Sequence, residues 1–180
     1  MADISHSESS RNIRRLVCCA ILSALSVVFL LVGGVTGILD LTALVVASMC
    51  VAFAVIEISV RWAWLVWAVT AVLTLLILPT KEIALLYLLG GMYPIAKSAF
   101  ERLHPLFSWL LKLSLFNTVQ LFYILAAQKL LGLSGEGYDF TAPTLLFGNA
   151  AFLVYDFALT VFITFYLVRL RRRFKLPGLK

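Results

Sequence analysis

Polar side chains inside otherwise apolar segments are the residues of this sequence best placed to do chemistry. Asp156 lies near the middle of the apolar segment 144–168, and Asn149 precedes it by seven residues, which places both on one face of a helix. Lys112 lies in the preceding apolar segment. Either charge alone costs about 2.5–3.5 kcal/mol in a membrane on insertion scales. Because the two segments are consecutive and should be neighbours, we predict that Lys112 and Asp156 form an ion pair inside the membrane.

Two amide side chains extend this pattern. Asn117 and Gln120 stand three residues apart on one helical face of the segment that holds Lys112. Together with Asn149 they predict an inward-facing polar strip whose inner end is the ion pair. Such a strip can bind a small solute, so Asn117, Gln120, Asn149 and Asp156 are candidate substrate-binding residues. The alternative is a hydrogen-bond network that only holds the helices together, and the sequence leaves both open.

Another candidate lies in "GGMYPIAK", where Gly90, Gly91 and Pro94 fall within five residues. Pro94 has no N–H and crowds the carbonyl of Gly90, which predicts a kink or a break in the helix. Broken helices often form transporter sites because the freed backbone groups can contact a solute. Tyr93 is therefore a candidate substrate-binding residue. In a plain packing kink it would serve only as a hydrogen-bonding partner between helices.

The motifs of common enzymes are absent from the sequence. It contains no H-E-x-x-H, no G-x-S-x-G and no phosphate-binding loop that ends in Lys-Ser or Lys-Thr. Cys18, Cys19 and Cys50 lie in apolar segments without metal-binding spacing. We therefore expect no enzymatic activity, no cofactor and no bound metal. Any ATP-driven process must use the nucleotide site of a partner.

The elements that position these residues are membrane-spanning helices. Of the 180 residues, 62% are hydrophobic and 13% are charged, and that charged share is about half that of a typical soluble domain. Since about 20 apolar residues span a bilayer as a helix, the sequence predicts an all-α bundle of six transmembrane helices. Turns rich in glycine, proline and charged residues separate the spans. They lie outside the hydrocarbon because lipid tails offer no hydrogen-bond partner to the backbone groups that a turn leaves unpaired. The spans cover residues 15–36, 39–60, 62–79, 82–101, 106–132 and 144–168.

The two ends of the chain frame this bundle. We expect a disordered polar tail at residues 1–10, a transmembrane domain at 11–170 and a basic cytoplasmic tail at 171–180. The predicted protein is a multi-pass protein of the plasma membrane of a bacterial cell.

Basic residues predict the orientation of the bundle. With both termini in the cytoplasm, nearly all lysines and arginines lie inside, Lys97 among them, as the positive-inside rule requires. Lys81 and Lys129 lie outside, and Lys112 lies within a span. The formal net charge of +6 therefore reflects topology, and we expect no nucleic acid partner.

In the first span, "AILSA" places Ala20 and Ala24 one helical turn apart. Lipid supplies no hydrophobic force between helices, so small residues promote association by letting two helices approach closely. The pair predicts a close helix–helix contact, either with another helix of this chain or with a separate membrane subunit.

Six helices in 180 residues, both termini inside and this Ala-x-x-x-Ala pair resemble the substrate-binding S-component of energy-coupling factor transporters. The segments "LVCCAILSALSVVFLLVGG", "LDLTALVVASMCVAFAVIE" and "GGMYPIAKSAFERL" share the general style of this family, and the resemblance covers about residues 11–170. It implies that Ala20 and Ala24 pack against a transmembrane coupling subunit, which two ATPase subunits drive. It also implies a small ligand, a vitamin or another micronutrient, that is captured from outside.

We therefore expect a membrane-embedded solute-binding subunit of an ATP-driven uptake transporter. Its partners would be the lipid bilayer, the coupling and ATPase subunits and a small-molecule ligand. A non-transport membrane scaffold or assembly partner, whose polar residues are purely structural, is the alternative.

Overall fold

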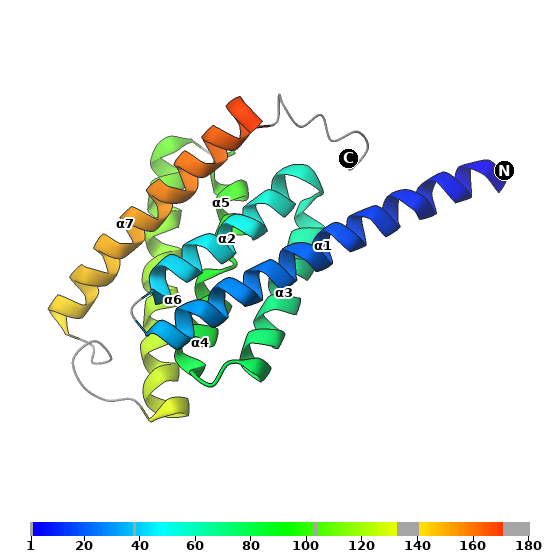
Figure 1. The fold of residues 1–180 in the computed structure, drawn as a ribbon. Coiled ribbons are helices and arrows are strands. Elements are labelled where there is room, and N and C mark those ends of the chain that lie inside the picture. The colour runs from blue at the N-terminus through cyan, green and yellow to red at the C-terminus, as the bar shows by residue number, and fades with distance from the viewer. Residues whose placement is uncertain (1, 38, 103, 133–140, 171–180) are drawn as a thin grey trace.

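The structure, a computed structural model, describes residues 2–37, 39–102, 104–132 and 141–170, and within these residues it consists of helices and short connections (Figure 1). In chain order the helices are α1 (Ala2–Thr36), α2 (Asp40–Glu57), α3 (Val60–Ile77), α4 (Lys81–Gly90), α5 (Tyr93–Phe100), α6 (Pro105–Leu131) and α7 (Ala142–Phe165), which a turn of π-helix, η1 (Tyr166–Leu170), extends.

Within the described residues, six helical segments are long and apolar enough to cross a membrane. They correspond one to one to the six spans predicted from the sequence, and α4 and α5 together make the fourth of them. The predicted all-α, six-helix fold is thereby confirmed. The side of the membrane that each end faces stays a prediction.

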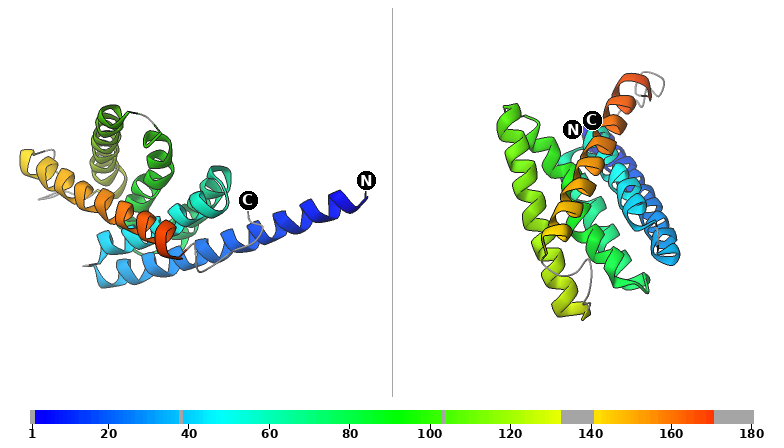
Figure 2. Two further views of the ribbon diagram at one scale, coloured as in Figure 1. Left: turned by 90° about the horizontal axis from the view of Figure 1, so that it is seen from above. Right: turned by 90° about the vertical axis from the view of Figure 1, so that its left-hand side faces the viewer.

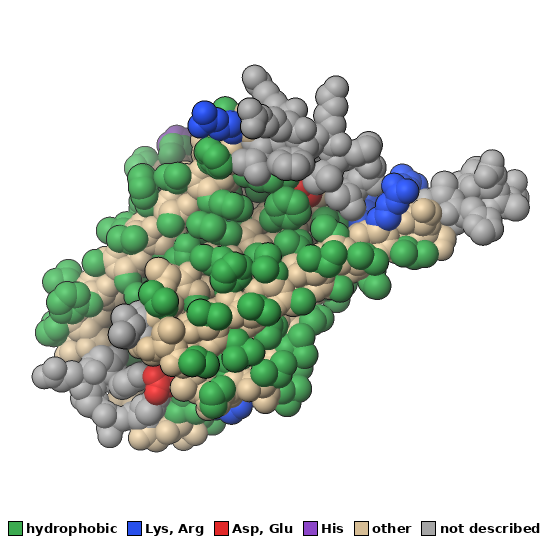
Figure 3. Space-filling view, in the orientation of Figure 1, with side chains coloured by type: hydrophobic (Ala, Val, Ile, Leu, Met, Phe, Trp, Pro, Cys, Tyr) green, Lys and Arg blue, Asp and Glu red, His purple; other side chains and the backbone are tan. Residues whose placement is uncertain are grey.

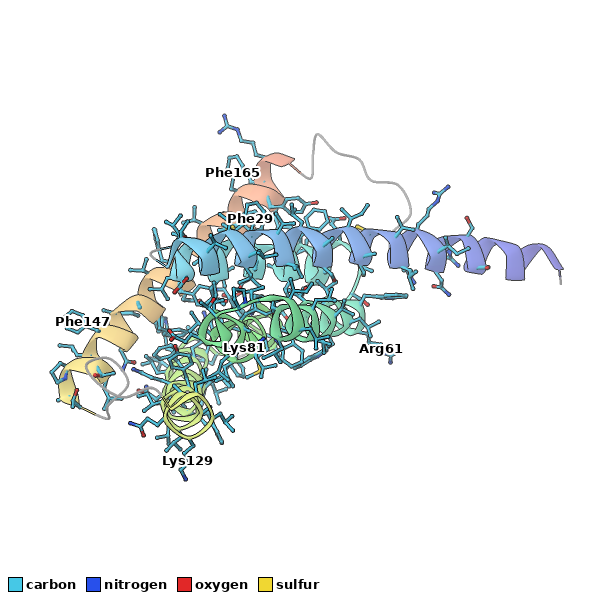
Figure 4. All side chains as sticks on the ribbon, turned by 60° about the horizontal axis from the view of Figure 1, so that its bottom comes forward. Phe29, Arg61, Lys81, Lys129, Phe147 and Phe165 are labelled. Atoms are coloured by element: carbon cyan, nitrogen blue, oxygen red, sulfur yellow. The ribbon has the colours of Figure 1, made fainter. Side chains whose placement is uncertain are left out.

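The surface of the bundle is apolar. Phe29 is 38% exposed, Phe147 75% and Phe165 49%, and their side chains point away from the helices in Figure 4. On the face drawn in Figure 3, hydrophobic side chains cover the middle of the molecule, and charged ones lie near its ends. Water does not solvate a continuous apolar surface of this kind, so its natural solvent is lipid.

Small residues bring α1, α2 and α3 together. Ala47 and Ala54 of α2 and Ala63 of α3 are completely buried. A methyl group at Gly33 of α1 would lie 2.5 Å from Cβ of Ala43, so α1 and α2 approach there at a distance that only glycine permits. In lipid such close approach stabilises helix pairs through dispersion contacts.

The fourth span is broken at the place that its sequence predicts. α4 ends at Gly90 and α5 begins at Tyr93, with Pro94 in the first turn of α5. Pro94 has no N–H with which to pair the carbonyl of Gly90. The hydroxyl of Tyr155 from α7 lies 3.2 Å from that carbonyl oxygen and donates to it. The break therefore exposes a backbone acceptor, and α7 satisfies it.

The remaining helices complete one side of the bundle. In both views of Figure 2, α6 and α1 lie on opposite sides, with α7 between them, and α7 packs against α2 and α6. The N-terminal part of α1 extends beyond the bundle (Figure 1). Since α1 begins at Ala2, the structure continues as helix through residues for which the sequence predicts a disordered tail. The predicted basic tail at 171–180 lies outside the described residues.

The predicted orientation can be tested at the two ends of the bundle. Arg61 and Lys129 are exposed and project from the bundle in Figure 4. In a variant whose native cysteines are replaced by alanine, a membrane-impermeant maleimide should label Lys129→Cys in intact cells. It should label Arg61→Cys only after the membrane is opened, because the positive-inside rule places Arg61 in the cytoplasm. The cysteine-free parent is the control, and the opposite labelling pattern would show that the termini face outside.

Candidate functional site

A cavity of about 990 Å³ lies between α2, α4, α5, α6 and α7. It is surrounded by the first turns of α2, the end of α4, the middle of α6 and the first half of α7. Its volume is at the upper end of the range typical of small-molecule sites. Most of its wall is apolar: among the lining residues are Leu41, Leu44, Leu86, Leu89, Leu115, Phe116, Val119, Ile124, Ala151 and Phe152.

Gln120 supplies a buried polar group to the cavity wall. It is 8% exposed, and its amide nitrogen donates to the carbonyl oxygen of Thr144, 3.0 Å away on α7. A carbonyl oxygen only accepts, so this contact fixes which way the amide points. The amide oxygen, Oε1, is buried and has no hydrogen-bond partner among the described residues. Such a group normally finds a partner, because leaving it unpaired costs about 1–3 kcal/mol.

Glycine at position 148 makes room for this amide. A methyl group there would lie 2.1 Å from Nε2 and 2.8 Å from Oε1 of Gln120. The side chain of Gln120 therefore lies directly against the backbone of α7, and its position depends on the absence of a side chain at Gly148.

Four aromatic rings close one end of the cavity, and we call them the aromatic layer (Tyr93, Phe116, Phe152 and Tyr155). Phe116 stacks on Phe152 with ring centroids 4.4 Å apart. Tyr93 meets Phe152 edge-on at 5.2 Å, and its ring lies tilted against that of Tyr155 at 5.4 Å. Offset and edge-on pairs of this kind are favourable beyond the area that they bury.

A cluster of four charged residues contacts the other side of the aromatic layer, and we call it the charge cluster (Lys97, Glu101, Lys112 and Asp156). Lys97 of α5 makes a close hydrogen-bonded ion pair with Asp156 of α7. Lys112 of α6 lies 3.5 Å from Oδ2 of Asp156. Glu101 forms an ion pair with Lys97 at 3.2 Å and accepts a hydrogen bond from Lys112 at 3.3 Å. The four formal charges sum to zero.

Three of these four side chains are almost fully buried. Lys97 is 1% exposed and Lys112 and Asp156 are each 8% exposed, whereas Glu101 is 45% exposed. The cluster therefore leads from the interior toward the connection between α5 and α6. Burial makes each charge costly to leave alone, and mutual pairing offsets that cost.

Tyr93 joins the aromatic layer to the charge cluster. Its ring lines the cavity, and its hydroxyl donates to Oδ1 of Asp156 at 2.6 Å. Thr160, one turn beyond Asp156, receives a further hydrogen bond from Lys97 at 2.7 Å. The carboxylate of Asp156 on α7 thus accepts hydrogen bonds from α5 and α6, and three helices meet at one group.

The structure brings the sequence candidates together only in part. Lys112 and Asp156 lie within ion-pairing distance, and Gln120 and Tyr93 line the cavity. Asn117 and Asn149 do not line it. They face each other across α6 and α7, with amide nitrogen-to-oxygen distances of 3.2 and 3.4 Å.

The predicted inward-facing strip is corrected by these positions. Asn117 is exposed on the outside of α6, although Gln120 on the same helix is buried. A spacing of three residues turns a helix by about 300°, which leaves the two side chains about 60° apart. At the edge of a helix–helix contact that angle separates a cavity-lining residue from a lipid-facing one. Asn117 and Asn149 instead satisfy each other's amides at the surface.

Sequence reasoning missed the closest partner of Asp156. The positive-inside rule counts Lys97 among the basic residues on the cytoplasmic side. The spacing held the signal: Tyr93, Lys97 and Glu101 stand four residues apart in sequence and share one helical face. That face meets α7 at Asp156.

Ala20 and Ala24 are exposed on α1, whereas Cys19 and Ser23 beside them are buried. Ser23 lies against α3, with its Oγ 3.5 Å from the carbonyl oxygen of Val66. The alanine pair therefore does not pack against another helix within the described part of this chain.

Comparisons of the chain with protein-family models, with curated proteins and with solved structures gave no match. Among the described residues, no group of three or more His, Cys, Asp or Glu side chains could hold a metal ion. The arrangement that does exist is a large apolar cavity, an aromatic layer and a neutral charge cluster, in that order along the bundle.

The charge cluster predicts a specific pattern of stability. Asp156→Asn should destabilise the protein by about 3 kcal/mol, because it leaves two buried lysines with Glu101 alone. Adding Lys97→Met should recover part of that loss, since the remaining Lys112–Glu101 pair is neutral. Lys97→Met alone should destabilise more than Lys112→Met alone, because Lys97 makes the closer contact with Asp156.

Thermal unfolding of the purified variants in detergent measures these effects in a double-mutant cycle. The exposed Lys129→Met is the matched control and should leave the midpoint unchanged. Additive effects of Asp156→Asn and Lys97→Met would contradict the coupling of these two charges.

Proposed function

We propose that this chain is a membrane-embedded solute-binding subunit, of the S-component type, in an ATP-driven uptake transporter. It captures a small molecule from outside the cell and presents it to a transmembrane coupling subunit that ATPase subunits drive. The chain itself performs no chemical reaction on the solute.

The cavity is the observation that carries this proposal. A helical bundle that serves only as a scaffold gains dispersion energy by filling its interior, and large voids are destabilising. A partly open cavity of about 990 Å³ lined by five helices is therefore expected where a ligand completes the packing. Under the positive-inside rule the cavity lies in the half of the bundle that faces outside.

The first helix supports the second part of the proposal. Ala20 and Ala24 are exposed, and larger exposed residues surround them, such as Val17 at 50% and Ile21 at 62%. A shallow depression of this kind fits a transmembrane helix of another subunit at close range. The sequence holds no phosphate-binding loop, so the energy of ATP must come through such a partner.

Native mass spectrometry of gently solubilised protein tests the proposal directly. We expect a complex in which this chain retains a small organic molecule and is bound to a second membrane subunit and two ATPase subunits. Ala151→Trp fills the cavity and should abolish retention of the small molecule without separating the subunits. A chain that carries neither a solute nor these subunits would contradict the proposed function and favour a scaffold.

The coupling face can be tested separately. Ala20→Leu combined with Ala24→Leu should leave the protein inserted and folded but reduce co-purification of the coupling subunit at least about tenfold, because the added side chains separate the helices. The matched control is Val69→Leu with Val72→Leu, which enlarges two exposed residues of α3. Unchanged co-purification at normal expression would show that the alanine face contacts only lipid.

A further inference from the structure

The side chains that line the cavity favour some classes of ligand over others. None of the described lining residues is charged, and six of them are aromatic: Tyr93, Phe116, Tyr123, Phe147, Phe152 and Tyr155. On the other side of the aromatic layer lies the charge cluster, where two lysines and two carboxylates already neutralise one another. An ion held against the aromatic layer would lose its hydration without gaining a counter-charge.

One buried polar atom among the described side chains of the wall still needs a hydrogen-bond partner. Oε1 of Gln120 is a buried acceptor without a partner among the described residues, while Nε2 of the same amide is held by Thr144. A ligand whose donor draws this oxygen to the cavity surface satisfies it, and a ligand without a donor leaves it unpaired, so the acceptor discriminates strongly between the two. Gly148, against which the amide lies, keeps it in place.

From these observations we infer that the cavity binds an uncharged, planar aromatic molecule that carries an N–H or O–H donor. Its rings lie against the aromatic layer, and its donor pairs with Oε1 of Gln120. This inference rests on the proposed function, because it names the class of solute that the same cavity takes. It separates that solute from charged nutrients and from the acyl chain of a lipid, which has no donor.

Three probes of nearly equal shape test the inference on the full chain in lipid nanodiscs. They are 1-naphthol, which is uncharged at pH 7 and has a donor, 1-methoxynaphthalene, which lacks the donor, and 1-naphthoate, which is an anion. Equilibrium dialysis against nanodiscs with and without the protein separates binding to the cavity from partition into lipid. We expect 1-naphthol to bind about fivefold to tenfold more tightly than 1-methoxynaphthalene, and 1-naphthoate at least about tenfold more weakly than either.

Two variants assign the site of binding. Gln120→Leu should lower the affinity for 1-naphthol to that for 1-methoxynaphthalene and leave the latter unchanged. Thr118→Val, which alters an exposed residue of the same helix, is the matched control and should change neither. Ala151→Trp should abolish binding of both neutral probes. The comparison of probes on the unsubstituted protein stands even if Gln120→Leu fails to fold.

Each other result overturns the inference in a recognisable way. Equal binding of 1-naphthol and 1-methoxynaphthalene would mean that the cavity selects apolar bulk alone, as an acyl chain would supply. Preferred binding of 1-naphthoate would mean that the solute is an anion. In both cases binding that Ala151→Trp abolishes would leave the proposed function standing. If no probe binds beyond the nanodisc control, the inference fails, and the proposed function fails with it only if native mass spectrometry also finds no retained solute.

Discussion

Hydrocarbon offers no partner to a buried carboxylate, so Asp156 must find its counter-charges within the protein. It finds Lys97 on α5 and Lys112 on α6, and Tyr93 adds a hydrogen bond from α5. These contacts join three helices that share little of the close small-residue packing that unites α1, α2 and α3. The half of the bundle that contains α5, α6 and α7 is therefore organised around one charge, and the other half around backbone proximity.

The break between α4 and α5 makes this arrangement possible. It allows α5 to begin as a new helix whose one face carries Tyr93 and Lys97 toward α7. Breaking a helix in lipid frees backbone groups, which is tolerable only where a side chain pairs them. Tyr155 does so for the carbonyl of Gly90. The same helix, α7, thus pairs the freed carbonyl through Tyr155 and forms the ion pair with Lys97 of α5 through the next residue, Asp156.

Segment length and hydropathy were enough to predict the six spans, and the chemistry of proline was enough to predict the break. The free-energy cost of an unpaired charge in the membrane was enough to predict the pair of Lys112 and Asp156, because two opposite charges in adjacent spans have few other partners. Prediction failed where rotation about a helix axis decides the outcome. Asn117 and Gln120 stand three residues apart, yet one faces outward and the other lines the cavity. Periodicity identifies a face, but only packing determines where the edge of that face lies. Lys97 was missed for a related reason, since a lysine near the end of a span can extend to water or turn inward.

The aromatic layer explains how an apolar cavity and a charge cluster can be neighbours. Rings of Phe116 and Phe152 stack between them, so the cavity is lined by carbon while the ions remain paired on the other side. Tyr93 belongs to both environments, because its ring lines the cavity and its hydroxyl holds Asp156. A solute that packs against this ring therefore touches a residue whose position is set by the ion pairs. Occupancy of the cavity and the geometry of the charge cluster share one side chain, and neither can shift far without moving it.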